Sequence, residues 1–260
     1  MSSPPLVLGI DIGTGGVRIL LVDALSGHVV DRADDAWPTE TPHPLWSEQN
    51  PDLWWSTTAA AIRRIVDELE SPTLIKAVTF AGQMHGLVLR DDNGTVLRPA
   101  ILWNDQRTID ECDEIHDRIG AQRCIALTGK PMLTGFTAPK LLWVQKNEPD
   151  IASRISAIEL PKDHVRFRAT GVHAIDVSDA SGTGWLDLHT RNWSAEICDA
   201  LNIDRSWLPA VHESSAIVGA IDASGAAATG LAEGTPVTAG AGDQAAAGLA
   251  CGIVDDTCVS

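Results

Sequence analysis

The stretch Leu-Val-Leu-Gly-Ile-Asp-Ile-Gly-Thr-Gly-Gly-Val-Arg-Ile-Leu-Leu-Val-Asp, residues 6–23, sets the architecture of this chain. It holds two apolar runs rich in β-branched residues, 6–12 and 17–22, joined by a glycine-rich segment. Such runs are typical of β-strands, and glycines between them favour a tight hairpin. Residues 23–27 have the composition of a turn, so residues 28–30 are expected to form a third antiparallel strand. The chain is therefore predicted to open with a three-stranded β-meander.

A helix is predicted after this meander. Asn50 and Pro51 supply an N-cap residue and a proline for the first helical position, and apolar residues then recur at helical spacing as far as Leu69. Residues 75–81 return as a strand. The helix can therefore cover one face of the sheet.

Further strands and helices alternate along the rest of the chain. The turn residues 92–94 predict a hairpin between residues 87–89 and 96–97, and residues 101–103 are expected to extend the sheet. The other predicted elements are a mainly helical region 108–160, with Pro139 near one helix start and Pro149 stopping that helix, the strands 216–220 and 236–239, and the helix 244–250. This alternation predicts the α/β class, with a mixed sheet flanked by helices.

The composition fits a globular protein and weighs against some partners. The 260 residues are 44% apolar and 21% charged. The net charge of −16 disfavours a nucleic-acid partner, because phosphate backbones are held mainly by clustered Lys and Arg. Since the chain shows no leader and no apolar segment of 18 residues, it is expected in the cytoplasm and not in a membrane. The cysteines are odd in number and lack paired spacing, which predicts reduced, mostly buried thiols at Cys112, Cys124, Cys198, Cys251 and Cys258.

The glycine-rich segment of the first hairpin is a candidate phosphate site. Its amides and its one hydroxyl can donate hydrogen bonds to phosphate oxygens. The residues concerned are Gly13, Thr14, Gly15 and Gly16. Asp11 at the lip would repel phosphate unless it binds Mg²⁺ or metal-bound water. The alternative is an ordinary glycine hairpin in which Asp11 accepts backbone hydrogen bonds.

A second candidate is Asp243, within Gly-Ala-Gly-Asp-Gln-Ala-Ala-Ala-Gly, residues 240–248. Small residues here lead from a strand into a helix, so Asp243 falls at the predicted N-cap, where capping contributes about 1 kcal/mol. The flanking glycines would also clear space for a ligand to reach the carboxylate. The local sequence leaves both roles open.

Two polar motifs at strand ends could contact a sugar. Gln83, Met84 and His85 lie between glycines and combine hydrogen-bonding groups with adaptable apolar contact. Trp103 could provide a flat platform for a sugar. The alternatives are a structural histidine at position 85, and a core tryptophan beside an Asp105 to Arg107 ion pair.

Taken together, these motifs resemble the FGGY carbohydrate kinases. Residues 9–18 look like the first phosphate motif of that family, and residues 82–86 look like the sugar motif of its xylulose-phosphorylating members. Further blocks agree in family order over essentially the whole chain: 43–49, 98–105, 135–143, 160–163 and 178–183.

The resemblance implies an actin-like, ribonuclease-H-like fold in two domains, with the sugar and ATP meeting between them. Residues 1–260 would be the N-terminal, sugar-binding domain, running slightly into the start of the second, and the ATP-binding domain is expected after Ser260. The implied reaction transfers the γ-phosphate of ATP to D-xylulose, giving D-xylulose 5-phosphate. Among the matching residues, Asp243 would be the catalytic base and Asp11 the acid near Mg²⁺ and the phosphates. Met84 and His85 would contact the sugar.

The chain departs from the family pattern at two positions. Gly15 stands where serine is common, and Gln244 stands beside the base where some members carry asparagine, so Gln244 is expected to adjust the fit of the sugar. Ribulose or glycerol is an alternative substrate, and a pentulose-binding module without catalysis is an alternative function. A face meant for a second domain would be exposed, which predicts self-association, with a homodimer as one form.

Overall fold

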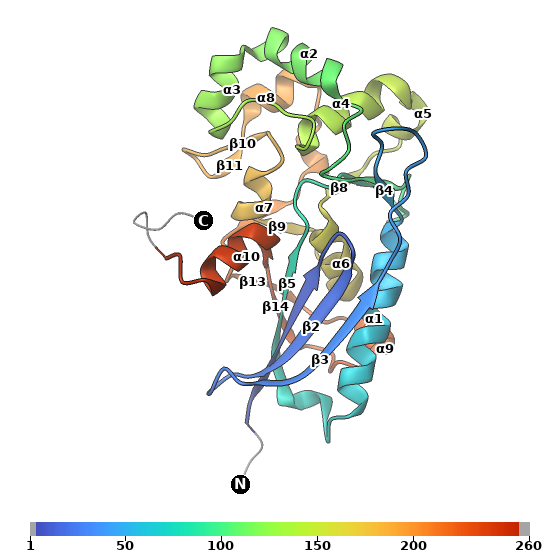
Figure 1. Cartoon of the computed structure of the whole chain (residues 1–260), viewed down its shortest axis with the longest axis vertical. Helices are drawn as coiled ribbons and strands as arrows, with labels where there is room; N and C mark the ends of the chain where they lie inside the picture. The colour runs from blue at the N-terminus through green and yellow to red at the C-terminus, as the bar shows by residue number, and fades with distance from the viewer. Residues whose placement is uncertain (1–3, 255–260) are drawn as a thin grey trace.

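The computed structural model describes residues 4–254, which are built around a seven-stranded mixed sheet (Figure 1). The strand order is β13-β14-β5-β1-β2-β3, and β15 also pairs with β5. The strands are β1 Leu6–Ile12, β2 Gly16–Asp23, β3 Val29–Ala36, β5 Ile75–Gly82, β13 Ile217–Ala220, β14 Pro236–Thr238 and β15 Ala241–Gly242. Strands β1, β2 and β3 pair antiparallel in sequence order, whereas β5 runs parallel to β1, β14 and β15. The predicted meander is confirmed.

The first hairpin follows from its sequence pattern. Buried residues alternate along β1, and the turn is closed by a 2.9 Å hydrogen bond from the Gly13 amide to the Gly16 carbonyl. Strand β3 runs to Ala36, well beyond the predicted residues 28–30. Its charged, mostly exposed side chains hide the strand pattern because it is an edge strand.

One face of the sheet is covered by three helices, α1 Pro51–Asp67, α6 Pro161–Thr170 and α9 Ala223–Thr229 (Figure 1). Helix α1 begins as predicted, with the Asn50 side chain accepting a hydrogen bond from the Asp52 amide. Its apolar side packs against β2 and β3, with Trp54 fully buried. The sheet and these helices share one core.

A second group of elements lies beyond the carboxyl ends of β1 and β5, at the top of Figure 1. Its helices are α2 Ile109–Ile119, α3 Ala121–Thr128, α4 Thr137–Asn147, α5 Pro149–Ala152, α7 Val177–Ser181 and α8 Ala195–Ala200. Four two-stranded sheets accompany them: β4 Glu48–Gln49 with β7 Ala100–Ile101, β6 Val88–Arg90 with β8 Ala157–Glu159, β9 Ala174–Asp176 with β12 Ala210–His212, and β10 Leu186–Asp187 with β11 Asn192–Trp193. Two 3-10 turns, Pro72–Leu74 and Arg205–Trp207, and the last helix, α10 Asp243–Ala250, complete the described elements.

Of two predictions about strand pairing, one was wrong and one is confirmed. Residues 101–103 do not extend the main sheet, because Ile101 pairs with Glu48 in the small β4–β7 sheet. The predicted hairpin between residues 87–89 and 96–97 forms: Arg90 bridges Val96, and the Leu97 amide donates to the Leu89 carbonyl at 2.9 Å. Strand β6 also pairs with β8, a partner that was not predicted. Short apolar runs show that a segment is extended without showing its partner.

The described cysteines are free, and Cys112, Cys124 and Cys198 are buried as predicted. Cys251 is exposed, which the prediction of mostly buried thiols did not single out, and Cys258 lies outside the described residues. Within residues 4–254, no helix is long and apolar enough to cross a bilayer.

Candidate active site

The candidate residues from three distant segments meet at the carboxyl ends of parallel strands. Strand β1 pairs with β5 so that Ile12 lies beside Gly82, and β15 pairs with β5 so that Gly242 lies beside the same Gly82. The glycine-rich hairpin, the 83–85 motif and Asp243 each follow one of these strand ends. Ligand sites in α/β sheets commonly form at such ends.

The glycine-rich hairpin is braced by side chains of neighbouring segments. The Thr14 hydroxyl donates to Gln83 Oε1 at 3.1 Å and accepts from the Trp103 indole nitrogen at 2.9 Å. The Thr14 carbonyl accepts hydrogen bonds from Trp37 and Gln49. The proton of this hydroxyl, which we expected to face a phosphate, is therefore already committed to Gln83.

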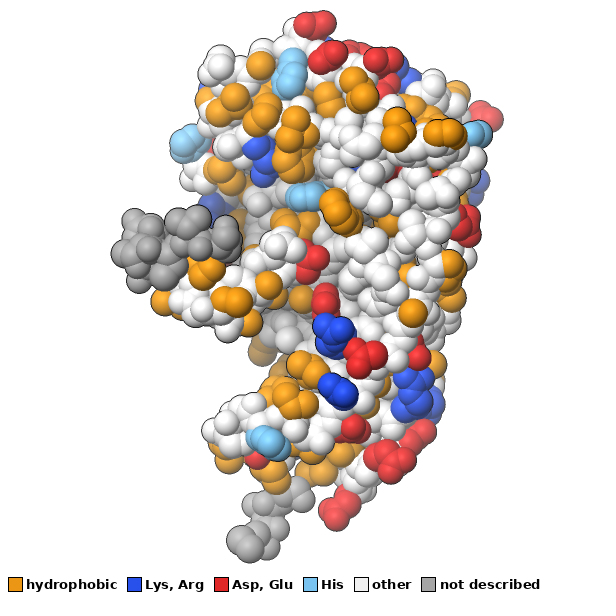
Figure 2. Space-filling view, in the orientation of Figure 1, with side chains coloured by type: hydrophobic (Ala, Val, Ile, Leu, Met, Phe, Trp, Pro, Cys, Tyr) orange, Lys and Arg blue, Asp and Glu red, His pale blue; other side chains and the backbone are white. Residues whose placement is uncertain are grey.

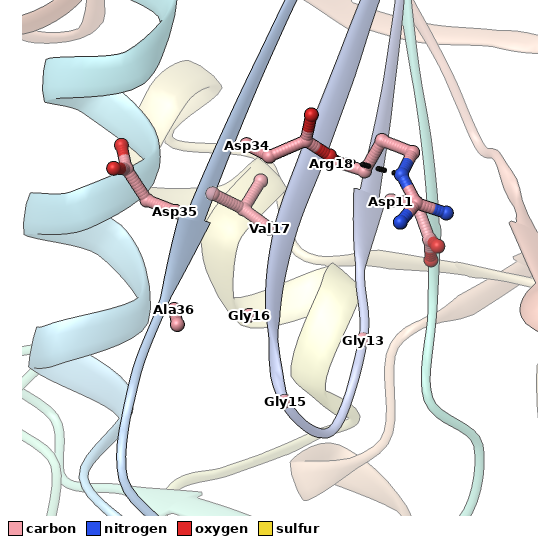
Figure 3. A pocket seen from close by; sticks show the side chains of 9 residues that line it. All are labelled: Asp11, Gly13, Gly15, Gly16, Val17, Arg18, Asp34, Asp35 and Ala36. Carbon is pink, nitrogen blue, oxygen red and sulfur yellow. Dashed lines mark hydrogen bonds and ion pairs between the residues drawn. The ribbon is translucent and has the colours of Figure 1, made fainter.

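Backbone amides of the same hairpin remain available. The Gly13 amide closes the turn, but the Thr14 and Gly15 amides form no hydrogen bond within the described part of the chain. A cavity of about 440 Å³ opens beside them (Figure 3). It is lined by Asp11, Gly13, Gly15, Gly16, Val17, Arg18, Asp34, Asp35 and Ala36.

Figure 3 shows how charge is arranged around this cavity. Arg18 reaches across from β2, and its Nε donates to Asp34 Oδ1 at 2.9 Å, with Asp11 close to its guanidinium. Asp35 points away toward α1, where it pairs with Arg64. The cavity thus joins a flexible glycine backbone to one cation and two carboxylates.

Asp11 is a partly buried acid at this site. Its Oδ1 is buried and has no hydrogen-bond partner within residues 4–254. Burial and the negative charge of Asp243 raise the pKa of Asp11, while Arg18 opposes that rise. An unpartnered buried carboxylate oxygen is a suitable ligand for a hard cation or for cation-bound water.

A second cavity, of about 740 Å³, is lined by both Asp11 and Asp243. In Figure 2 the surface is hollowed between α10 and the strands below it, and acidic and basic side chains gather along that hollow. Ser214, Thr238 and Ala246 also line the cavity. One space therefore connects the two candidate acids.

Asp243 does not cap its helix, which corrects the predicted N-cap position. Helix α10 begins at Asp243, with Gly242 at the cap and no side-chain capping bond. Asp243 Oδ1 accepts from the adjacent Gln244 amide, at 2.7 Å, while the Gln244 side chain is exposed. Burial raises the pKa of Asp243. The carboxylate is half-buried and open to a ligand.

His85 is held in one orientation and one protonation state. Its backbone is left-handed, with φ of 69°, and its Nδ1 lies 2.9 Å from the Gly182 carbonyl oxygen. Burial and nearby Lys140 lower the pKa of His85 to about 4, so the ring is neutral at neutral pH. A carbonyl only accepts, so Nδ1 carries the proton and Nε2 is an acceptor. Nε2 can thus accept a hydrogen bond from a ligand hydroxyl.

Met84 and Gln83 occupy different environments. A Cβ added at Gly242 would lie 2.9 Å from the Met84 side chain, so the sugar motif packs directly on the segment that leads to Asp243. Gln83 is only 1% exposed, and its amide is taken up by Thr14 and Gln49. Gln83 therefore braces the hairpin, and a direct contact with a sugar remains only a prediction.

Trp103 lies on the surface, so the alternative of a core tryptophan was wrong. Its side chain is 48% exposed and its indole nitrogen donates to Thr14. The accompanying ion pair is present, with Arg107 Nη2 2.7 Å from Asp105 Oδ2. The exposed indole beside the hairpin is compatible with a platform for a ligand.

Sequence reasoning missed residues that hold the site from a distance. Lys140 is fully buried and donates to the carbonyls of His85 and Gly135, at 2.9 and 2.7 Å. Gly182 accommodates the His85 ring, because an added Cβ would lie 2.4 Å from Nδ1. Both residues fall in blocks that resemble the family, but these contacts span 55 and 97 positions and leave no local signal.

Comparisons with known proteins find similar sequences and similar structures. The model of the "FGGY family of carbohydrate kinases, N-terminal domain" matches residues 6–250. The chain is 46% identical over 250 residues to the xylulose kinase of Escherichia coli (strain K12), covering 96% of this chain and 51% of that protein. The solved xylulose kinase from Rhodospirillum rubrum aligns with a TM-score of 0.90 at 30% identity, over 96% of this chain and 51% of that one. The solved gluconate kinase from Lactobacillus acidophilus aligns with a TM-score of 0.86 at 26% identity, over 93% and 48%. The chain spans about half the length of the curated relatives that it matches.

Proposed function

Because this chain belongs to the FGGY family of carbohydrate kinases, we propose that it forms the sugar-binding half of an ATP-dependent kinase for D-xylulose. In this proposal residues 1–260 hold the sugar and the first phosphate loop, and the remaining nucleotide contacts come from a second, actin-like domain. The product is D-xylulose 5-phosphate.

A single observation carries the proposal: the Asp243 side chain does not cap its helix, and it lines a cavity that Asp11 also lines. A sugar hydroxyl is a poor nucleophile at neutral pH, so a carboxylate within hydrogen-bond reach must take its proton as the bond to phosphorus forms. The raised pKa of Asp243 brings that carboxylate closer to the pH at which a base works. In the reaction the proton passes from the hydroxyl to a carboxylate oxygen of Asp243, the sugar oxygen bonds to the γ-phosphorus, and the bond from that phosphorus to the bridging oxygen breaks to release ADP.

The other residues of the site bind and orient. His85 Nε2 accepts a hydrogen bond from a second hydroxyl of the sugar, and Met84 covers an apolar part of its chain. The free amides of Thr14 and Gly15 donate to phosphate oxygens. Holding both reactants in register is the main way in which a protein accelerates phosphoryl transfer.

The residues present fit a Mg²⁺ ion that accompanies ATP. The unpartnered Oδ1 of Asp11 would hold the ion through bound water. When bound, the ion neutralises charge on the phosphate oxygens. Arg18, which lines the same cavity, opposes the rise in the pKa of Asp11.

We propose D-xylulose rather than another polyol as the substrate because two curated xylulose kinases share 46% and 42% identity with this chain. The solved gluconate kinase has a similar fold, so the fold alone does not select the sugar. A kinase for ribulose or glycerol is therefore the alternative that the same assay tests.

The decisive experiment compares Asp243→Asn with wild type in the whole protein, using D-xylulose and MgATP. Because the amide has no basic oxygen pair, we expect kcat to fall by about 10²- to 10⁴-fold. Asp117→Asn, an exposed acid on α2, is the matched control and should keep wild-type activity. Activity that survives in Asp243→Asn would remove Asp243 as the base, and faster turnover of ribulose or glycerol would replace D-xylulose as the substrate.

A further inference from the structure

A group of charged side chains is buried directly beneath the segment that carries Asp243, and the reaction described above does not use it. Each member is at most 1% exposed, and the members are Lys162, Asp163, Arg166, Asp176 and Asp179. Lys162 Nζ lies 2.6, 2.8 and 3.0 Å from the carboxylates of Asp163, Asp176 and Asp179. We call these five residues the ionic cluster.

Stability alone is a weak reason for such a cluster. Taking charges out of water costs several kcal/mol per ion, and apolar replacements of buried ion pairs are often as stable. Within the cluster two cations face three carboxylates, and burial raises the pKa of Asp179 to about 8. Lys162, by contrast, holds the pKa of Asp176 low. Asp176 is therefore the member that stays ionised as a hydrogen-bond acceptor.

Asp176 fixes the orientation of the Ser178 side chain. Its Oδ2 accepts from the Ser178 amide at 2.8 Å and also from the Ser178 hydroxyl. Since the hydroxyl proton is committed to Asp176, the lone pairs of Ser178 Oγ point elsewhere. They accept a 3.0 Å hydrogen bond from the backbone amide of Gly242. Gly242 immediately precedes Asp243.

The ionic cluster also contacts the other end of the segment before Asp243, at Ala239. Arg166 donates to the Ala239 carbonyl at 2.5 Å and pairs with Asp163 at 2.9 Å. Gly240 lies between the Ala239 and Gly242 contacts. Its φ is 85°, and an added Cβ would lie 2.1 Å from the Phe80 carbonyl oxygen. This backbone has no room to move toward β5. Residues 239–242 are thus fixed from both ends by groups that never reach the ligand cavity.

We infer that Ser178 is a positioning residue for the base: held by Asp176, it fixes the Gly242 amide and thereby the place of the Asp243 carboxylate. The inference rests on the proposed role of Asp243. Its physical basis is that a displacement of about 1 Å at a reacting group can cost about 100-fold in rate.

The test uses three variants of the whole protein. Ser178→Ala removes the acceptor of the Gly242 amide, and Ser178→Thr restores a hydroxyl at the same place. Ser181→Ala is the matched control, because Ser181 lies on the same helix α7 and its hydroxyl donates to the Ser178 carbonyl, at 2.7 Å, rather than contacting Gly242. Should Ser178→Ala fail to fold, Ser178→Cys offers a weaker acceptor for the same comparison.

Two readouts are combined. Amide hydrogen exchange over residues 239–243 should speed up at least about tenfold in Ser178→Ala and stay at the wild-type rate in Ser181→Ala. With D-xylulose and MgATP, kcat should fall about 10- to 100-fold in Ser178→Ala with KM for the sugar changed less than twofold. Ser178→Thr should recover most of kcat.

Each outcome decides a separate question. Equal exchange in Ser178→Ala and Ser181→Ala, or equal kcat, overturns the positioning role. An unchanged kcat in Asp243→Asn, measured alongside, overturns the proposed function instead. A fall in kcat for Asp243→Asn without one for Ser178→Ala leaves the base in place and rejects Ser178.

Discussion

At the scale of single residues, neighbouring groups determine which atoms of the site donate hydrogen bonds and which accept them. The Gly182 carbonyl can only accept, so it leaves Nε2 of His85 as an acceptor. Gln83 Oε1 accepts the hydrogen bond that the Thr14 hydroxyl donates, so the Thr14 and Gly15 amides are the hairpin donors open to a ligand. Residues that never touch a ligand therefore decide which atoms face it.

Gly182→Ala tests this arrangement at His85. The new methyl would lie 2.4 Å from Nδ1, so the ring must turn and lose its bond to the 182 carbonyl. One lost neutral hydrogen bond is worth about 1 kcal/mol, so we expect D-xylulose to bind about 5- to 10-fold more weakly by calorimetry.

Gly248→Ala is the control for this change. A Cβ at Gly248 meets nothing within 4 Å, and alanine suits its place in α10. Sugar binding should be unaltered in this variant. Equal affinities in both variants would show that the orientation of His85 does not matter for the sugar.

At the scale of elements, α6, β9 and α7 bring the ionic cluster together. Lys162, Asp163 and Arg166 lie on α6, Asp176 ends β9 and Asp179 lies on α7. Contacts between α6 and β9 and between α7 and β15 connect this packing to the segment before Asp243. The short helices are thus ordered by buried charge as well as by apolar contact.

The cluster predicts how stability depends on pH. The pKa of Asp179 is raised to about 8 in the folded chain, above the ordinary value of 3.8 for an aspartate. Between these values Asp179 holds a proton in the folded state that it releases in the unfolded chain, so this group makes the free energy of unfolding fall as pH rises toward 8. His85 and Lys140, whose pKa values are lowered in the folded chain, contribute with the opposite sign, and their contributions are common to wild type and the variant below. One such proton contributes a slope of at most about 1.4 kcal/mol per pH unit.

Asp179→Asn should flatten that slope, because asparagine is neutral at every pH. Urea unfolding at pH 5.5, 6.5 and 7.5 measures it, with Asp117→Asn as the exposed control. The lowered pKa of Asp176 acts only at lower pH, outside this window. A slope that matches wild type in Asp179→Asn would mean that Asp179 does not hold the proton.

At the scale of the whole molecule, two cores support one site. The sheet with α1, α6 and α9 forms the first core, and the helices beyond the strand ends form the second. The hairpin comes from the first, whereas His85 packs against Phe136, which precedes α4, and Gly182, which follows α7. The expected actin-like, ribonuclease-H-like fold class is confirmed by the aligned kinase structures.

Residues 1–260 should bind D-xylulose on their own. His85, Met84 and Asp243, the proposed sugar contacts, all belong to the described part of this chain. Calorimetry should therefore give saturable D-xylulose binding, and weaker MgATP binding because this chain offers the nucleotide one phosphate loop. His85→Ala serves as the sugar-site control. Sugar binding by the whole protein but not by these residues would place essential sugar contacts elsewhere.

The sequence by itself determined the meander, helix α1 and the α/β class, because apolar periodicity and turn residues act over a few neighbours. It also pointed to Asp11 and Asp243 as candidate acids. It missed the length of β3 and the partners of β6 and β7, since a strand pattern does not name its partner.

Only the tertiary structure decided how the acids are placed. The helix-cap role and the ligand-facing role of Asp243 look alike in local sequence, and the missing capping bond separates them. The tie from Asp176 through Ser178 to Gly242 spans 64 positions between its last two members, so no local pattern encodes it. Long-range packing brings these groups together, and buried charge then fixes their directions.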